Sequence, residues 1–74
     1  MGVEDEVSAN AVRVYRVMKD LGTLSEEKMG TPERITQTAK LPKNMVLNAL
    51  QELQAKGYAR RKVREKAAGY YLTR

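Results

Sequence analysis

The stretch that decides the fold is TPERITQTAKLPKNMVLNALQELQAKGY, residues 31–58. Its first three residues, Thr-Pro-Glu, are a strong helix start because they combine an N-cap side chain, a first-turn proline and an acid near the positive end of the helix. Pro42 then forces the residue before it out of helical geometry, so the first helix must end ahead of it. We therefore expect a short helix over residues 32–39.

The same proline opens a second, longer helix. After Pro42, apolar residues recur at intervals of three and four, which is the spacing of one buried helix face: Val46, Ala49, Leu50 and Leu53. The pair Lys56-Gly57 is a typical C-terminal signal, so this helix is expected over residues 42–56. Only two residues, 40 and 41, separate the two helices, and this is the spacing of a helix-turn-helix unit.

A further helix is expected before this unit. Ser8 offers a hydrogen-bonding N-cap, and the apolar residues that follow it recur at helical spacing: Val14, Val17, Met18 and Leu21. Gly22 is a natural stop, because glycine readily adopts the left-handed conformation found just beyond helix ends. We expect this helix over residues 8–21.

Two segments of the N-terminal half carry weaker signals. Residues 1–7 read MGVEDEV and are expected to be a disordered acidic leader. Residues 22–30 form a connection bounded by glycines, in which we expect Leu24 and Met29 to reach the core. The sequence does not decide whether this connection also contains a short strand.

After the second helix of the unit, the residue pattern changes from the period of a helix to that of a strand. Residues 58–63 and 69–73 are short and rich in β-forming side chains, and residues 64–68 between them suit a loop of about five residues. A hairpin alone is only marginally stable in water, so we expect it to pack on the helices. Tyr70 and Leu72 share one face of the second strand and are assigned to the core.

The positive charge is concentrated at the C-terminal end. The net charge is +5, yet residues 1–57 carry eight Lys/Arg and eight Asp/Glu and are neutral as a whole. Residues 58–74 contain six basic residues against one acidic residue, so the whole excess lies there. A concentrated basic segment on a neutral body is typical of a surface that binds a polyanion.

The composition argues against several classes of function. The chain contains no cysteine and no histidine, which excludes disulfides and argues against a structural zinc site and against nucleophile–histidine catalysis. Its 74 residues suffice for a single domain with a small core. We expect no enzymatic activity, no cofactor and no membrane span, and we expect a cytoplasmic protein that is nucleoid-associated if prokaryotic.

A family resemblance rests on the helix-turn-helix unit and the end of the chain. The run from Thr31-Pro32-Glu33-Arg34-Ile35 through Lys40-Leu41-Pro42-Lys43-Asn44 to Lys56-Gly57-Tyr58, closing on Tyr70-Tyr71-Leu72-Thr73, resembles winged helix-turn-helix proteins of the MarR, ArsR and IclR type. The resemblance covers roughly residues 8–74. It implies an α+β fold that is mostly helical, with three helices and a C-terminal hairpin wing. It also implies double-stranded DNA as the partner, residues 42–56 as the recognition helix and residues 58–73 as the wing.

The residues expected to contact DNA form two groups. The side chains left outward on the recognition helix are Lys43, Asn44, Leu47, Asn48 and Gln51. Asn and Gln suit adenine, Lys suits guanine or phosphate, and Leu suits a thymine methyl. The wing residues expected on phosphates or in the minor groove are Arg60, Arg61, Lys62, Arg64 and Lys66. Because strand residues alternate in direction, we expect Arg60 and Lys62 on one strand face and Arg64 and Lys66 at the tip.

Two other functions remain open at this point. The end of the chain, with Gln51-Glu52-Leu53, Lys56-Gly57 and Tyr71-Leu72-Thr73-Arg74, is also similar to a winged-helix protein of the archaeal and eukaryotic small ribosomal subunit, which would imply an RNA partner. Exposure of Met45 and Leu47 would instead favour a protein-interaction winged helix within a larger complex. If the DNA-binding form is a homodimer, we expect helix 8–21 to be the interface.

Overall fold

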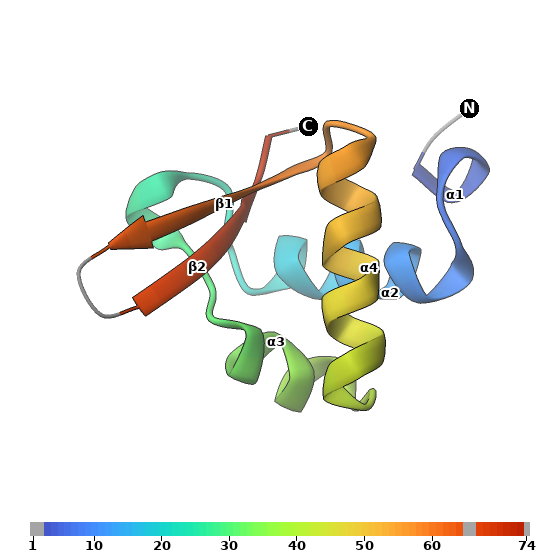
Figure 1. The fold of residues 1–74 in the computed structure, drawn as a ribbon, viewed down its shortest axis with the longest axis horizontal. Helices are drawn as coiled ribbons and strands as arrows, with labels where there is room; N and C mark the ends of the chain where they lie inside the picture. Colours follow the sequence, from blue (N-terminus) through green and yellow to red (C-terminus); the bar gives the residue numbers. More distant parts are fainter. Residues whose placement is uncertain (1–2, 65–66, 74) are drawn as a thin grey trace.

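The structure, a computed structural model, describes residues 3–64 and 67–73, and it places three helices against a two-stranded C-terminal hairpin (Figure 1). The helices that form the body are α2 (Ala9–Asp20), α3 (Pro32–Ala39) and α4 (Lys43–Ala55). The hairpin consists of β1 (Ala59–Arg64) and β2 (Ala67–Leu72). The predicted order of helices and hairpin is therefore confirmed.

The predicted helix starts are formed by side-chain caps. The Ser8 side chain accepts a hydrogen bond from the backbone N–H of Ala11, and Thr31 accepts one from the N–H of Arg34. Each bond satisfies a donor that has no partner within its own helix. Pro42 is the N-cap of α4 rather than its first helical residue, so α4 begins one residue later than predicted.

The turn between α3 and α4 depends on Lys40. This residue has a φ of 57° and lies in the left-handed region, and its N–H donates to the carbonyl of Thr36. A left-handed residue directly after a helix turns the chain sharply and satisfies a terminal carbonyl. The sequence did not indicate this conformation, because glycine is the residue that normally marks it.

The core lies where α4 crosses α2 and α3, and its centre is fully buried. The predicted face of α4, consisting of Val46, Ala49, Leu50 and Leu53, packs on the other helices and on the base of the hairpin. Met18 from α2 and Ile35 from α3 meet this face with no exposed surface. Tyr70 and Leu72 close the core from the hairpin, as predicted.

The hairpin is antiparallel and has two different faces. Ala59 is opposite Leu72 and Arg61 is opposite Tyr70, so this face of the hairpin continues the core. Arg60 is opposite Tyr71 on the outer face, which points away from the core. Pairing extends to Arg64 and Ala67, so the predicted loop over residues 64–68 was too long.

The connection between α2 and α3 is hydrogen-bonded to β2. Gly30 forms a single antiparallel bridge with Tyr70, and the N–H of Leu72 donates to the carbonyl of Thr23. Leu24 is 56% exposed, so its predicted core position was wrong. Thr23 is buried instead, and its hydroxyl donates a hydrogen bond to the Met18 carbonyl. A short 3-10 helix, Glu26–Lys28, completes this segment.

The N-terminal segment is ordered over residues 3–6, which corrects for these residues the prediction of a disordered leader over residues 1–7. A single helical turn, α1 (Val3–Glu6), lies beside the C-terminal end of α4 and the start of the hairpin (Figure 1). The hydroxyl of Tyr58 donates to the Glu6 carboxylate, and the Tyr58 ring meets Tyr15 edge to face with centroids 5.8 Å apart. The Tyr58–Glu6 bond joins α1 to the domain, and the ring contact joins α2 to the start of the hairpin. A local sequence pattern does not indicate either long-range contact.

Ser8 also connects α2 to α4, and its replacement by alanine should be destabilising. The Ser8 backbone N–H and hydroxyl donate to the two carboxylate oxygens of Glu52, at 2.6 and 2.8 Å. Ser8→Ala removes the cap and one of these bonds, so we expect a loss of about 1–2 kcal/mol in the free energy of unfolding. Urea denaturation followed by circular dichroism measures it. Ser25→Ala is the matched control, because the Ser25 side chain makes no cap bond, and equal losses in the two variants would contradict the assignment.

Candidate nucleic-acid interface

The exposed face of α4 carries most of the residues predicted for base contacts. Lys43, Asn44, Asn48 and Gln51 are exposed, on the side of the helix opposite its buried face. Leu47 is only half-buried and packs against the edge of the core. α4 therefore presents a polar face with one apolar side chain at its flank. Met45 is also half-buried, so neither it nor Leu47 forms a fully exposed apolar patch.

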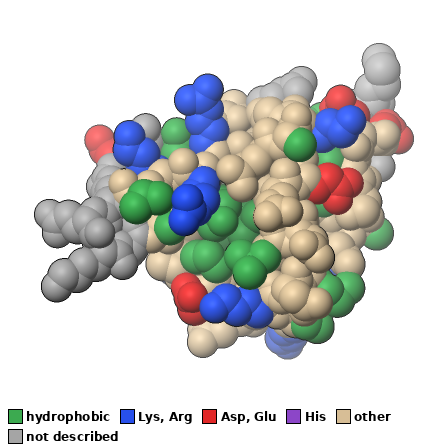
Figure 2. All heavy atoms as spheres, viewed as in Figure 1, with side chains coloured by type: hydrophobic (Ala, Val, Ile, Leu, Met, Phe, Trp, Pro, Cys, Tyr) green, Lys and Arg blue, Asp and Glu red, His purple; other side chains and the backbone are tan. Residues whose placement is uncertain are grey.

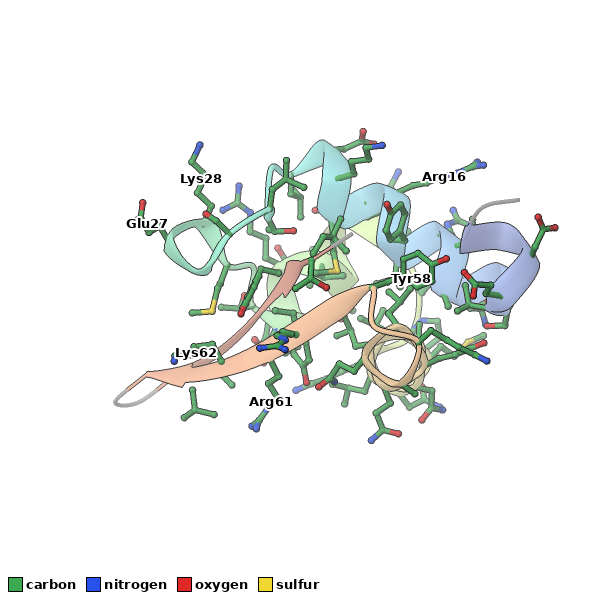
Figure 3. All side chains as sticks on the ribbon, turned by 90° about the horizontal axis from the view of Figure 1, so that it is seen from above. Arg16, Glu27, Lys28, Tyr58, Arg61 and Lys62 are labelled. Atoms are coloured by element: carbon green, nitrogen blue, oxygen red, sulfur yellow. The ribbon has the colours of Figure 1, made fainter. Side chains whose placement is uncertain are left out.

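The hairpin divides the predicted wing residues between its two faces. Arg61 is on the face that continues the core, whereas Arg60 and Lys62 are on the outer face, as the alternation predicted. Figure 3 shows Arg61 and Lys62 extending to opposite sides of β1. All three side chains are exposed. A rigid duplex that contacts one face of the hairpin would therefore not meet Arg61 together with Arg60 and Lys62.

A concave surface separates α4 from the hairpin on the face seen in Figure 2. Hydrophobic side chains lie at its centre, and basic side chains lie around it over the hairpin and near the start of α4. Arg61 extends toward this face from β1. Arg64 ends β1 beside the hairpin tip, and Lys66 lies outside the described residues, so the predicted tip contacts stay predictions.

Glu33 is an acidic residue at this surface that the sequence analysis did not include in the site. The Lys43 ammonium donates to the Glu33 carboxylate at 3.4 Å, which connects the first turn of α3 to the first turn of α4. A backbone hydrogen bond from the N–H of Glu33 itself, followed by the bond and charge of Lys43, lowers the pKa of the Glu33 carboxyl. The site thus contains a carboxylate that competes with phosphate for Lys43.

The titration of Glu33 tests this arrangement. We expect NMR to show a pKa for the Glu33 carboxyl below its ordinary value. Because the pKa is lowered in the folded state, any stabilisation is present above the ordinary pKa and is lost as the pH falls through the lowered one. Lys43→Ala should raise the pKa only partway, since the backbone bond is the larger cause. A complete return to the ordinary value would show that Lys43 dominates instead.

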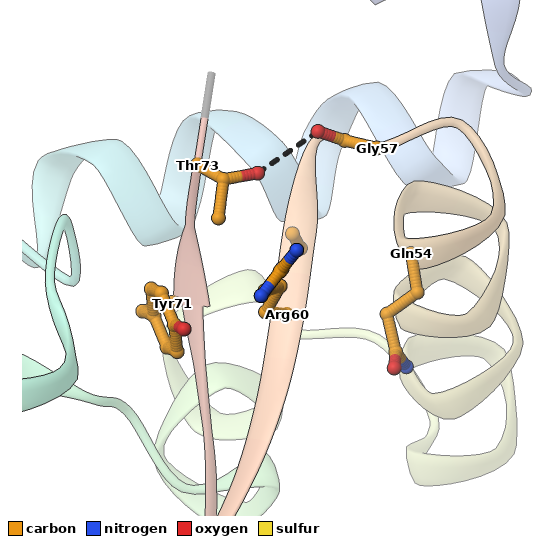
Figure 4. Close-up of a pocket in the computed structure, with 6 residues that line it drawn as sticks. Gln54, Gly57, Arg60, Tyr71 and Thr73 are labelled. Carbon is orange, nitrogen blue, oxygen red and sulfur yellow. Dashed lines mark hydrogen bonds between the residues drawn. The ribbon is translucent and has the colours of Figure 1, made fainter.

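A shallow pocket lies on the other side of the hairpin, next to the C-terminal end of α4. It has a volume of about 450 Å³ and is lined by Gln54, Gly57, Ala59, Arg60, Tyr71 and Thr73. The Thr73 hydroxyl donates to the Gly57 carbonyl at 2.9 Å and closes one end (Figure 4). Sequence reasoning did not identify this pocket, because its residues come from α4 and from both strands.

Comparison with known proteins identifies similar folds. No protein-family model matches the chain, and none of the curated proteins matches its sequence. A candidate DNA-binding protein from Ralstonia eutropha JMP134 is 25% identical, with a TM-score of 0.75 over 92% of this chain and 85% of that one. The DNA-binding TubR fragment from Clostridium botulinum is 18% identical, with a TM-score of 0.76 over 90% of this chain and 84% of the fragment.

A third structure agrees with these two. The N-terminal domain of a DNA-binding protein is 14% identical, with a TM-score of 0.74 over 95% of this chain and 63% of that chain. The helix order, the two-residue turn and the hairpin pairing, together with these similarities, show that this chain has a winged helix-turn-helix fold. In this fold α4 stands where the recognition helix is expected and the hairpin is the wing. Within the described residues, no helix has the length and apolar character needed to span a membrane.

Proposed function

We propose that this protein binds double-stranded DNA without catalysing a reaction, with α4 in the major groove and the α4-facing side of the hairpin on the phosphates. The observation that carries the proposal is the exposed polar face of α4 directly after a helix-turn-helix turn, together with Arg61, which extends from β1 to the side of the molecule on which α4 lies (Figure 3). The major groove of B-DNA is wide enough for one helix. The names of the similar structures, all of them DNA-binding or candidate DNA-binding proteins, support the same partner.

The side chains of this surface would have two different roles, which follow from their chemistry. Asn44, Asn48 and Gln51 offer paired donors and acceptors that match adenine, so they would distinguish base pairs. Lys43 and Arg61 would bind phosphates and add affinity without sequence preference. This combination suits a small transcriptional regulator or a chromatin-associated factor, and we expect it to be cytoplasmic, or nucleoid-associated if the protein is prokaryotic.

Binding to duplex DNA across a salt series tests the proposal. Contacts from Lys43, Arg61 and the wing tip would neutralise about four phosphates, which corresponds to a log–log salt slope of about −3.6 on B-DNA. We expect a labelled random DNA duplex to bind with such a slope and more tightly than an RNA duplex of the same sequence. Tighter binding to the RNA duplex would favour the ribosomal alternative. Absence of binding to either duplex at low salt would overturn the proposal.

A further inference from the structure

The outer face of the hairpin carries basic and aromatic side chains that the proposed duplex site does not use. Arg60 is paired with Tyr71 and Lys62 with Gly69, so these residues lie on the side of the sheet opposite Arg61. Neither strand contains an acidic residue. The outer face is therefore a second positive surface, on the side of the hairpin opposite Arg61.

Arg60 and Tyr71 also form two walls of the pocket next to α4. In Figure 4, Arg60 stands between the Tyr71 ring on β2 and the Gln54 amide on α4. The pocket thus combines a guanidinium, an aromatic ring and an amide that can both donate and accept hydrogen bonds. Its volume of about 450 Å³ lies within the range of sites for small planar molecules.

Met29 packs over Gly69 on the outer face, next to Lys62. Gly69 faces Lys62 across the hairpin, and a Cβ placed on Gly69 would lie 2.7 Å from the Cβ of Met29. Met29 therefore occupies the space that a side chain at position 69 would need. A chain molecule bound both at Lys62 and in the pocket at Arg60 and Tyr71 would lie against Met29.

We infer that the outer face of the hairpin binds a single-stranded nucleic acid, with an unpaired base in the Gln54–Arg60–Tyr71 pocket and the adjoining phosphate at Lys62. Aromatic rings beside basic side chains are the usual means of binding unpaired bases, which stack while the backbone is held by charge. Bases in a duplex are stacked on each other and cannot enter such a pocket. This surface is separate from the proposed duplex site, and the inference does not depend on that site.

The test uses a labelled twelve-nucleotide oligo-dT and a labelled DNA duplex, each titrated with the full chain. We expect Tyr71→Thr to weaken oligo-dT binding at least about fivefold, because one stacked base is lost, while duplex binding stays unchanged. Tyr71→Phe keeps the ring and should restore oligo-dT binding, which separates stacking from folding. Arg61→Ala is the control on the opposite face, and it should weaken the duplex more than oligo-dT.

Two results would overturn the inference. One is equal binding of oligo-dT by Tyr71→Thr and the unmodified protein, with circular dichroism showing both folded. The other is equal displacement of oligo-dT by inorganic polyphosphate in both proteins, which would show that charge alone holds the strand. Loss of duplex binding with oligo-dT binding retained would contradict only the proposed duplex function.

Discussion

Replacing Leu50 by alanine is expected to lower the free energy of unfolding by about 3 kcal/mol. Leu50 has no exposed surface and lies at the centre of the α4 face that packs on α2 and α3. Truncation removes buried carbons and leaves a cavity that the surrounding helices fill only in part. A domain of this length is stabilised by on the order of 0.1 kcal/mol per residue, so the loss is a large share of the total.

Thermal unfolding followed by circular dichroism measures this effect, and the melting temperature should fall by more than about 10 °C. Asn48→Ala is the matched control on the same helix, because Asn48 is exposed. Its effect on stability should stay within about 0.5 kcal/mol. If Leu50→Ala lowered the free energy of unfolding as little as the control does, the described packing of α4 on the other helices would be contradicted.

Reversing the charge of Lys43 and Arg61 together should have the largest effect on DNA binding. At about 50 mM salt, each phosphate contact contributes roughly a tenfold gain in affinity through counterion release. The double variant Lys43→Glu/Arg61→Glu loses two such contacts, so we expect duplex affinity to fall by about two orders of magnitude. The salt slope should also become shallower by about two. Fluorescence anisotropy with a labelled duplex over a salt series measures both quantities.

The outer face of the hairpin supplies a control with the same change in net charge. Arg60→Glu/Lys62→Glu alters the protein by an equal amount, but both residues lie on the face of the hairpin opposite Arg61. We expect this variant to keep most of the duplex affinity and nearly the original salt slope. Equal losses in the two double variants would mean that only net charge matters, and the assignment of a duplex-binding face would fail.

The helix-turn-helix was predictable because its signals are local. The Thr31 cap and the prolines at 32 and 42 constrain the backbone over one turn each, so they act in the same way in any tertiary context. α3 accordingly has the predicted bounds, and α4 differs by one residue at each end. The buried face of α4 followed from its spacing, since a helix can bury only one stripe against a small core.

The arrangement of the hairpin could be predicted only in part from local sequence signals. Residues 58–73 were expected to form a basic wing, and their alternation placed Arg60 and Lys62 together. The face that meets α4 depends on which side packs on the core, and the Tyr70 and Leu72 contacts decide this. The predicted wing set is consequently divided, with Arg61 on the core side of the hairpin and Arg60 and Lys62 on its outer side.

The sequence by itself determined the helix order, the turn between α3 and α4, the buried stripe of α4 and the presence of a basic hairpin, because capping, proline geometry and residue spacing act over a few residues. The tertiary structure alone decided which face of the hairpin packs on the core, the pairing of Glu33 with Lys43, the Ser8–Glu52 bonds and the Gln54–Arg60–Tyr71 pocket. Each of these joins residues from different elements. Their positions depend on how the helices and the hairpin pack, and no local pattern encodes that packing.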